Sequence, residues 1–163
     1  MIILGIDPGS RTTGYGLIRT QGNKLLHLDS GAIRLHKYEA FSEKLCVLYE
    51  QIALLIQAHQ PDAISLEQAF FGINVRSALM LGQVRGSVLT LAGLKKIPVF
   101  EYSATAVKKA ITGYGRAEKP QMQEMVRLLL NLRQIPKPHD AADALALAIC
   151  HAHSKPPLAA KTS

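Results

Sequence analysis

Four carboxylates stand on segments of this 163-residue chain that are otherwise apolar. Asp7 ends the opening run MIILGID, and Glu67 ends the run AISLE. Asp140 and Asp143 are three residues apart in DAADALALA, a spacing that places both on one face of a helix. Carboxylates are costly to bury unpaired, and the neighbouring sequence supplies no obvious Lys or Arg partner. Because a bound cation is the usual solution, these residues predict a metal site.

A set of four carboxylates offers only oxygen donors, which suit Mg²⁺ or Mn²⁺. Such a cluster can hold two ions roughly 3.5–4 Å apart, one that activates a water and one that stabilises the leaving oxygen. We therefore predict hydrolysis with water as the nucleophile and no covalent Ser, Cys or Tyr intermediate. Simpler roles stay open for two of the acids. Asp7 precedes Pro-Gly and could form a turn, and Asp140 could cap the last helix, which would leave Asp143 unexplained.

Positive charge dominates the rest of the chain. Nineteen Lys and Arg stand against twelve Asp and Glu, which gives a net charge of +7 and a pI near 9.6. Setting the four carboxylates apart leaves eight acids, so the remaining surface is more basic than the net charge suggests. Residues 105–137 favour a polyanionic partner such as nucleic acid, although any single base there could simply be solvated. The bases in this segment are Lys108, Lys109, Arg116, Lys119, Arg127, Arg133 and Lys137.

Hydrophobic periodicity predicts the elements that position these residues. Strands are expected at 1–7, 15–20, 24–35, 62–68 and 98–102. Helices are expected at 39–60, 74–94, 103–112, 120–132 and 139–153. A strand–helix–strand crossover makes the fourth strand parallel to one strand of the opening meander. We predict an α/β fold, a mixed five-stranded sheet with helices on both faces, in which the ends of the first and fourth strands meet.

Length and composition limit the alternatives. We expect one domain over residues 1–154 and a disordered tail over 155–163. A two-lobed actin-like ATPase needs a longer chain. The apolar runs are too short to span a bilayer, and the first residues lack the features of a signal peptide. Cys46 and Cys150 are expected to be reduced core residues, which favours a cytoplasmic protein.

Several long motifs in order resemble one known family over residues 1 to about 153. They are ILGIDPGSRTTGYG, LEQAFFGIN, LGQVRG, FEYSATAVKKAITGYGRAEKPQM and DAADALALAI. Together they look like the RuvC family of Holliday junction resolvases. The resemblance implies a ribonuclease-H-like fold and a homodimer that makes paired symmetric nicks in four-way DNA junctions, in recombination and repair. It also implies two Mg²⁺ per subunit, 5′-phosphate ends and coupling to a branch-migration motor complex of the RuvA and RuvB type.

The same resemblance implies roles for individual residues. Asp7, Glu67, Asp140 and Asp143 match the catalytic, metal-binding acids, and Lys108 and Lys119 match lysines near the scissile phosphate. Phe70 matches a residue that stacks on junction bases, whereas Ile73 departs from a position that is often basic in relatives. His139 is expected to face solvent at a helix start. The predicted DNA contacts, from motifs and from charge, are Ser10, Arg11, Phe70, Asn74, Arg76, Lys108, Lys109, Arg116 and Lys119.

A ridge of small residues in the segment 74–94 indicates close helix packing, within the monomer or across a two-fold axis. The ridge consists of Ala78, Gly82, Gly86 and Thr90. Two other functions stay open: a related ribonuclease-H-like nuclease acting on structured RNA, and a non-catalytic scaffold that binds junctions. Comparing the cleavage of a four-way DNA junction with the cleavage of structured RNA tests the RNA nuclease. The scaffold predicts no measurable effect of Asp7→Asn, whereas a nuclease would lose cleavage and keep junction binding.

Overall fold

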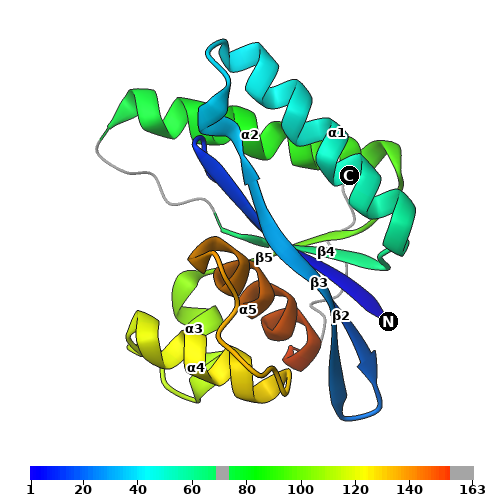
Figure 1. Ribbon diagram of the computed structural model, residues 1–163, viewed down its shortest axis with the longest axis vertical. Helices are drawn as coiled ribbons and strands as arrows, with labels where there is room; N and C mark the ends of the chain where they lie inside the picture. The colour runs from blue at the N-terminus through cyan, green and yellow to red at the C-terminus, as the bar shows by residue number, and fades with distance from the viewer. Residues whose placement is uncertain (69–73, 155–163) are drawn as a thin grey trace, which may run out of the picture.

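A five-stranded sheet forms the centre of the computed structural model, which describes residues 1–68 and 74–154. The strand order is β3-β2-β1-β4-β5 (Figure 1). The predicted disordered tail over 155–163 lies outside the described residues. The strands are β1 (Ile2–Asp7), β2 (Thr12–Gln21), β3 (Lys24–Arg34), β4 (Ala63–Glu67) and β5 (Val99–Tyr102).

The sheet is mixed, as the order of elements predicted. β2 runs antiparallel to both β1 and β3, whereas β4 runs parallel to both β1 and β5. The expected parallel pairing of the first and fourth strands is therefore confirmed, with Ile3 opposite Ala63 and Ile6 opposite Leu66. Because strand order reverses at β1, the carboxyl ends of β1 and β4 lie side by side at one edge of the sheet.

Helices cover both faces of the sheet, which confirms that prediction (Figure 1). α1 and α2 pack on one face, and α3, α4 and α5 pack on the other. No helix within 1–68 and 74–154 combines the length and apolarity needed to cross a membrane. The helices are η1 (Leu35–Lys37), α1 (Phe41–His59), α2 (Val75–Leu94), α3 (Ala104–Thr112), α4 (Lys119–Leu129) and α5 (His139–His153).

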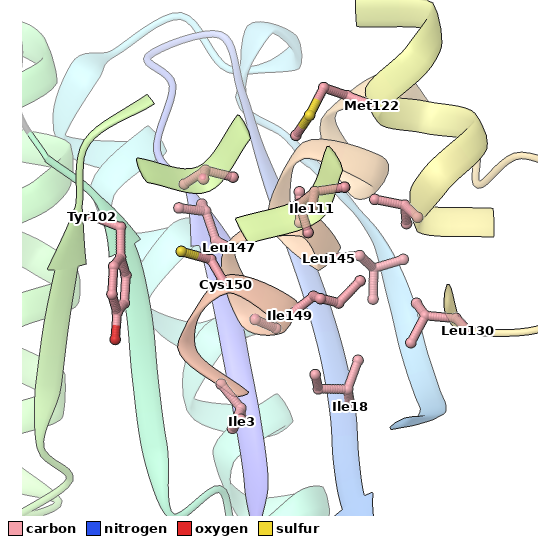
Figure 2. Packing of buried hydrophobic residues seen from close by; sticks show 14 of the residues in the cluster. Ile3, Ile18, Tyr102, Ile111, Met122, Leu130, Leu145, Leu147, Ile149 and Cys150 are labelled. Atoms are coloured by element: carbon pink, nitrogen blue, oxygen red, sulfur yellow. The ribbon is translucent and has the colours of Figure 1, made fainter. Parts of the chain in front are cut away.

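Side-chain alternation along β1 builds two separate cores. Leu4 and Ile6 point toward α1 and α2, whereas Ile3 points toward α5. Figure 2 shows the second core, where Ile3 and Ile18 of the sheet meet Leu145 and Ile149 of α5. Asp7 has the same parity as Ile3, so its side chain belongs to the face that α5 covers.

Several element ends differ from the periodicity. β2 begins at Thr12, so Gly14 lies within a strand and not in the predicted loop. α4 begins at Lys119 and carries Pro120 in its first turn, with a capping box between Glu118 and Gln121.

One predicted core cysteine is in fact exposed. Cys46 lies on the outward side of α1, whose buried residues include Leu48, Ile52 and Ile56. Cys150 is buried as expected, and both cysteines are free.

Candidate active site

Two predicted carboxylates meet because the strands that carry them are parallel neighbours. Asp7 is the last residue of β1 and Glu67 is the last residue of β4. The Ser65 hydroxyl donates a hydrogen bond of 2.8 Å to the Leu147 carbonyl of α5, which fixes the face of β4 that α5 covers. Glu67, two residues along the strand, belongs to the same face. Both carboxylates therefore lie on the α5 side of the sheet edge.

The third and fourth carboxylates come from α5, which lies very close to the sheet. A Cβ atom at Gly5 would lie 2.0 Å from the Ala144 carbonyl oxygen, and one at Gly14 would lie 2.1 Å from the Asp140 carbonyl oxygen. Only glycine permits this approach. Since Gly14 pairs with Asp7 across β1 and β2, the first turn of α5 lies directly beside Asp7.

A pocket of about 290 Å³ opens where these elements converge. Asp7, Glu67 and Asp143 line it, so three acids from three elements share one cavity. Asp140 is not among the lining residues. The remaining wall is formed by two lysines and by residues of α3, α4 and α5: Ala104, Val107, Lys108, Lys119, Met122, Ala146 and Leu147.

Burial and repulsion between carboxylates both disfavour negative charge in the pocket. The pKa of Asp7 is raised from 3.8 to about 7, first by burial and then by three neighbouring negative charges. These neighbours are Asp143, Glu67 and Asp140, in order of effect. Burial and then Asp143 also raise the pKa of Glu67, against a lowering by Arg85. Asp140 thus acts on the site through its charge although it does not line the cavity.

Lys119 is the cation that opposes this repulsion most directly. Its Nζ donates a hydrogen bond of 2.9 Å to Asp143 Oδ2, and this bond raises the pKa of Lys119. Asp143 therefore holds the Lys119 side chain at the pocket, where Lys119 is predicted to bind phosphate. Lys108 of α3 lines the same cavity.

The carboxylate oxygens of the pocket are the type of ligand that a divalent metal ion such as Mg²⁺ prefers. All the pocket acids supply oxygen, and a cation would offset the carboxylate charges that, after burial, raise the pKa of Asp7. In residues 1–68 and 74–154, however, no three His, Cys, Asp or Glu side chains are close enough to hold one ion as they stand.

The other predicted DNA contacts differ in their exposure to solvent. Arg11, Arg76, Lys109 and Arg116 are exposed, and Ser10 is half-buried. Asn74 caps α2, because its Oδ1 accepts a hydrogen bond of 3.1 Å from the Ser77 N–H. Phe70 and Ile73 lie outside the described residues.

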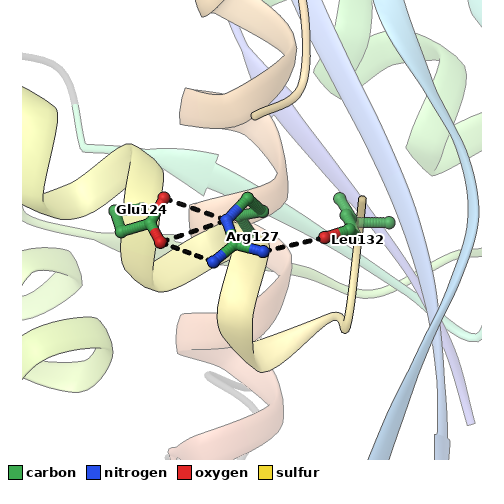
Figure 3. A network of polar contacts seen from close by, with 3 residues as sticks. All are labelled: Glu124, Arg127 and Leu132. Atoms are coloured by element: carbon green, nitrogen blue, oxygen red, sulfur yellow. Dashed lines mark hydrogen bonds and ion pairs between the residues drawn. The ribbon is translucent and has the colours of Figure 1, made fainter. Parts of the chain in front are cut away.

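One base of the segment 105–137 serves the fold. Arg127 donates from Nη2 to Glu124 Oε1 at 2.6 Å and from Nη1 to the Leu132 carbonyl at 3.1 Å (Figure 3). These bonds join α4 to the turn that follows it. At the start of α5, His139 is exposed as expected, and its Nδ1 lies 2.7 Å from Gln123 Nε2.

Sequence reasoning missed two contributors to the site. The first is a pair of glycines in contact with α5: Gly5 was expected only as part of the first strand, and Gly14 lay outside the predicted strands. Glycine on the buried face of a strand is the available signal. The second is Arg85, a buried arginine of α2 whose guanidinium contacts the backbone of Glu67. An arginine inside the apolar pattern of a helix was the signal in that case.

One face of α2 has apolar residues directed to solvent. Val75 is 80% exposed and Leu79 is 64% exposed, and together with Gly82 they line a shallow groove. A Cβ at Gly82 or Gly86 would meet nothing within 4 Å in the described chain. The small-residue ridge therefore packs against nothing within the described monomer at these two positions.

Comparisons with known proteins agree with this architecture. The family model described as crossover junction endodeoxyribonuclease RuvC matches residues 3–151. A protein of that name from Geotalea uraniireducens is 50% identical over 94% of this chain and 90% of its own length. One from Desulfitobacterium hafniense is 49% identical over 94% of this chain and 93% of its own length.

Solved structures extend the comparison to the fold. Thermus thermophilus RuvC, 31% identical, superimposes with a TM-score of 0.86 and covers 94% of both chains. The same protein in complex with a Holliday junction substrate gives a TM-score of 0.89, over 94% of this chain and 93% of that chain. The mixed sheet with helices on both faces is thus the ribonuclease-H-like fold that the motifs implied. On this agreement in sequence and in structure, the chain belongs to the RuvC family of crossover junction endodeoxyribonucleases.

Proposed function

We propose that the chain is a structure-selective DNA endonuclease that resolves four-way junctions by paired symmetric nicks. The observation that carries this proposal is the pocket in which Asp7, Glu67 and Asp143 converge beside Lys108 and Lys119. Negative and positive side chains in one cavity suit a phosphodiester held by cations and lysines. Family membership supports the substrate, because the relatives are named for junction cleavage and one was solved with a Holliday junction.

The carboxylates are proposed as the metal ligands. Asp7, Glu67 and Asp143 would hold Mg²⁺ from the pocket wall, and Asp140 would join them from the first turn of α5. We propose two Mg²⁺ per subunit, with Mn²⁺ able to replace them. When bound, such ions activate a water and neutralise charge on the leaving oxygen. Asp7 must lose its proton to bind a metal. Its raised pKa makes this loss less favourable until a cation offsets the charge of the neighbouring carboxylates.

The lysines are proposed to act on the phosphate. Lys108 and Lys119 line the cavity, where their ammonium groups would stabilise charge that develops on the scissile phosphate. Further contacts along the DNA backbone are proposed for exposed or half-buried polar residues, and base stacking is proposed for Phe70. The backbone contacts are Ser10, Arg11, Asn74, Arg76, Lys109 and Arg116.

The exposed face of α2 is proposed to pack against a second copy of the chain. Val75 and Leu79 are apolar and exposed, and the glycines beside them leave room for a close helix. A two-fold dimer also supplies two sites for two symmetric cuts. Coupling to a branch-migration motor stays a prediction from the family resemblance, and a cytoplasmic location stays a prediction from the two cysteines.

One assay tests the function. Purified protein is mixed with a labelled mobile four-way junction in Mg²⁺ or in EDTA, and cuts on all strands are mapped and their ends identified. We expect paired symmetric nicks with 5′-phosphate ends in Mg²⁺ alone, and little cleavage of duplex DNA or structured RNA. Preferred cleavage of RNA would instead favour the RNA nuclease.

Asp7→Asn separates an enzyme from a scaffold. We expect this variant to bind the junction in EDTA as the wild type does and to lose metal-dependent nicking. Binding without cleavage by the wild type, over a range of Mg²⁺ and Mn²⁺ concentrations, would contradict the nuclease and support the scaffold.

A further inference from the structure

Arg85 is the one Arg, Lys, Asp or Glu that is buried in the part of the chain that the structure describes, with 8% of its surface exposed. It lies in the middle of α2, between the core residues Val84 and Val88. A guanidinium removed from water is strongly unfavourable unless each side of it is hydrogen-bonded and its charge is paired. The partners of Arg85 therefore explain why it can stay buried.

Those partners lie on two adjacent strands. Nη1 donates a hydrogen bond to the backbone carbonyl of Glu67, the last residue of β4. Nη2 donates to Glu101 Oε1 of β5 at 2.5 Å. β4 and β5 are parallel, with Glu67 opposite Tyr102, so one planar fork joins α2 to the carboxyl ends of both strands.

The hydrogen bond from Arg85 to the Glu67 carbonyl connects the guanidinium to the site. Glu67 ends β4, and the ladder with β1 has already ended at Leu66. The Glu67 side chain nevertheless lines the pocket with Asp7 and Asp143. A backbone fixed at its carbonyl has less freedom to turn the carboxylate away from its neighbours, which repel it.

We propose that Arg85 is a positioning residue, whose guanidinium holds the end of β4 against α2 and β5 and thereby sets the place of the Glu67 carboxylate in the pocket. The inference rests on the proposed function, in which Glu67 binds metal. Groups that orient a metal ligand from outside the coordination sphere commonly change metal affinity about ten- to a hundred-fold when they are removed. Arg85 should therefore affect Mg²⁺ affinity without touching the metal.

The test uses Arg85→Gln, Arg85→Lys and Glu101→Gln in the full chain. Mg²⁺ binding is measured by calorimetry on metal-free protein without DNA, and junction affinity is measured in EDTA. We expect Arg85→Gln to weaken Mg²⁺ binding by about ten-fold or more. Arg85→Lys should weaken it similarly, because one ammonium nitrogen cannot serve both strands. Glu101→Gln should have a smaller effect, since it keeps the acceptor and removes the charge.

Cleavage rates add a second readout. If Glu67 is only misplaced, raising Mg²⁺ should restore most of the rate, and junction affinity in EDTA should stay within about two-fold of wild type. Val88→Ala is the matched control, because it removes core contacts from the next turn of the same helix. We expect this control to lower the unfolding midpoint and to leave Mg²⁺ affinity unchanged.

Two results would overturn the inference: unchanged Mg²⁺ affinity in the Arg85 variants, or an equal loss in Val88→Ala. If Arg85→Gln does not fold, Arg85→Lys and Glu101→Gln decide the question, because Glu101 is partly exposed and its change is conservative. Failure of the wild type to bind Mg²⁺ or to cut junctions would contradict the proposed function itself, which is a separate outcome.

Discussion

Asp7→Asn should make the metal-free protein more stable while it abolishes cleavage. The charge of Asp7 is opposed by burial and by three carboxylates, which raise its pKa from 3.8 to about 7. A carboxyl group whose pKa is raised by folding binds more protons in the folded state than in the unfolded state. Stability is therefore lost as pH rises from about 4 to about 7, and the loss is complete above that range. Asparagine carries no charge and escapes this loss.

The magnitude follows from the shift. A rise of about three units corresponds to about 4 kcal/mol at pH 8, at about 1.4 kcal/mol per unit. At pH 5 the same shift accounts for only about 1.7 kcal/mol, because the folded carboxyl is then largely protonated. The pocket is open to solvent, which screens the repulsion, so we expect the advantage of Asp7→Asn to grow by about 1–2.5 kcal/mol from pH 5 to pH 8. Comparing the stability advantage of Asp7→Asn at the two pH values cancels any effect of the asparagine amide that does not depend on pH.

Urea unfolding in EDTA at the two pH values measures the effect. Glu50→Gln, which removes one exposed carboxylate of α1, is the matched control and should show little change with pH. Addition of Mg²⁺ at pH 8 should stabilise the wild type more than Asp7→Asn, since binding to the folded state alone raises stability. A difference between Asp7→Asn and wild type that stays constant from pH 5 to pH 8 would refute the electrostatic reasoning.

Three further predictions test the placement of α5, the DNA surface and the dimer. Gly14→Ala should lower both the unfolding midpoint and cleavage, because its Cβ would lie 2.1 Å from a carbonyl of α5; Gly82→Ala, which meets nothing, should keep the monomer stable. Lys109→Ala should weaken junction binding and reduce the slope of log affinity against log salt by about 0.9, whereas Lys24→Ala at the far hairpin should change neither. Gly86→Leu should give a folded monomer by sedimentation; an unchanged dimer would show that α2 is not the interface.

The mixed sheet and the meeting of two acids could be predicted because both follow from local patterns. Apolar runs predict where the strands lie, and a crossover helix between two strands makes those two parallel. Parallel neighbours have their carboxyl ends at the same end of the sheet. Asp7 and Glu67 each end such a run, so no tertiary information was needed to place them near each other. The helical spacing of Asp140 and Asp143 likewise requires only the period of α5.

The remaining features of the site depend on contacts between distant segments. Lys119 reaches Asp143 from another helix, and Arg85 of α2 reaches Glu101 on the face of β5 that α2 covers. No spacing rule predicts such pairs, because they depend on how helices pack. The exposure of Cys46 was missed for a related reason. A small apolar residue beside the buried stripe of α1 gives little indication of which side it faces.

The pocket also shows how the fold supports a site that costs stability. Repelling carboxylates at a sheet edge favour separation of α5 from the strands, and this repulsion adds to burial in raising the pKa of Asp7. Residues Ala144–Cys150 of α5 are all buried, and Gly5 lets this apolar face lie directly on β1. The burial of this face offsets the repulsion, because apolar contacts contribute at every turn of the helix whereas the carboxylates act only at its start. The helix is therefore held at its apolar middle, while its N-terminal turn presents charge to the pocket.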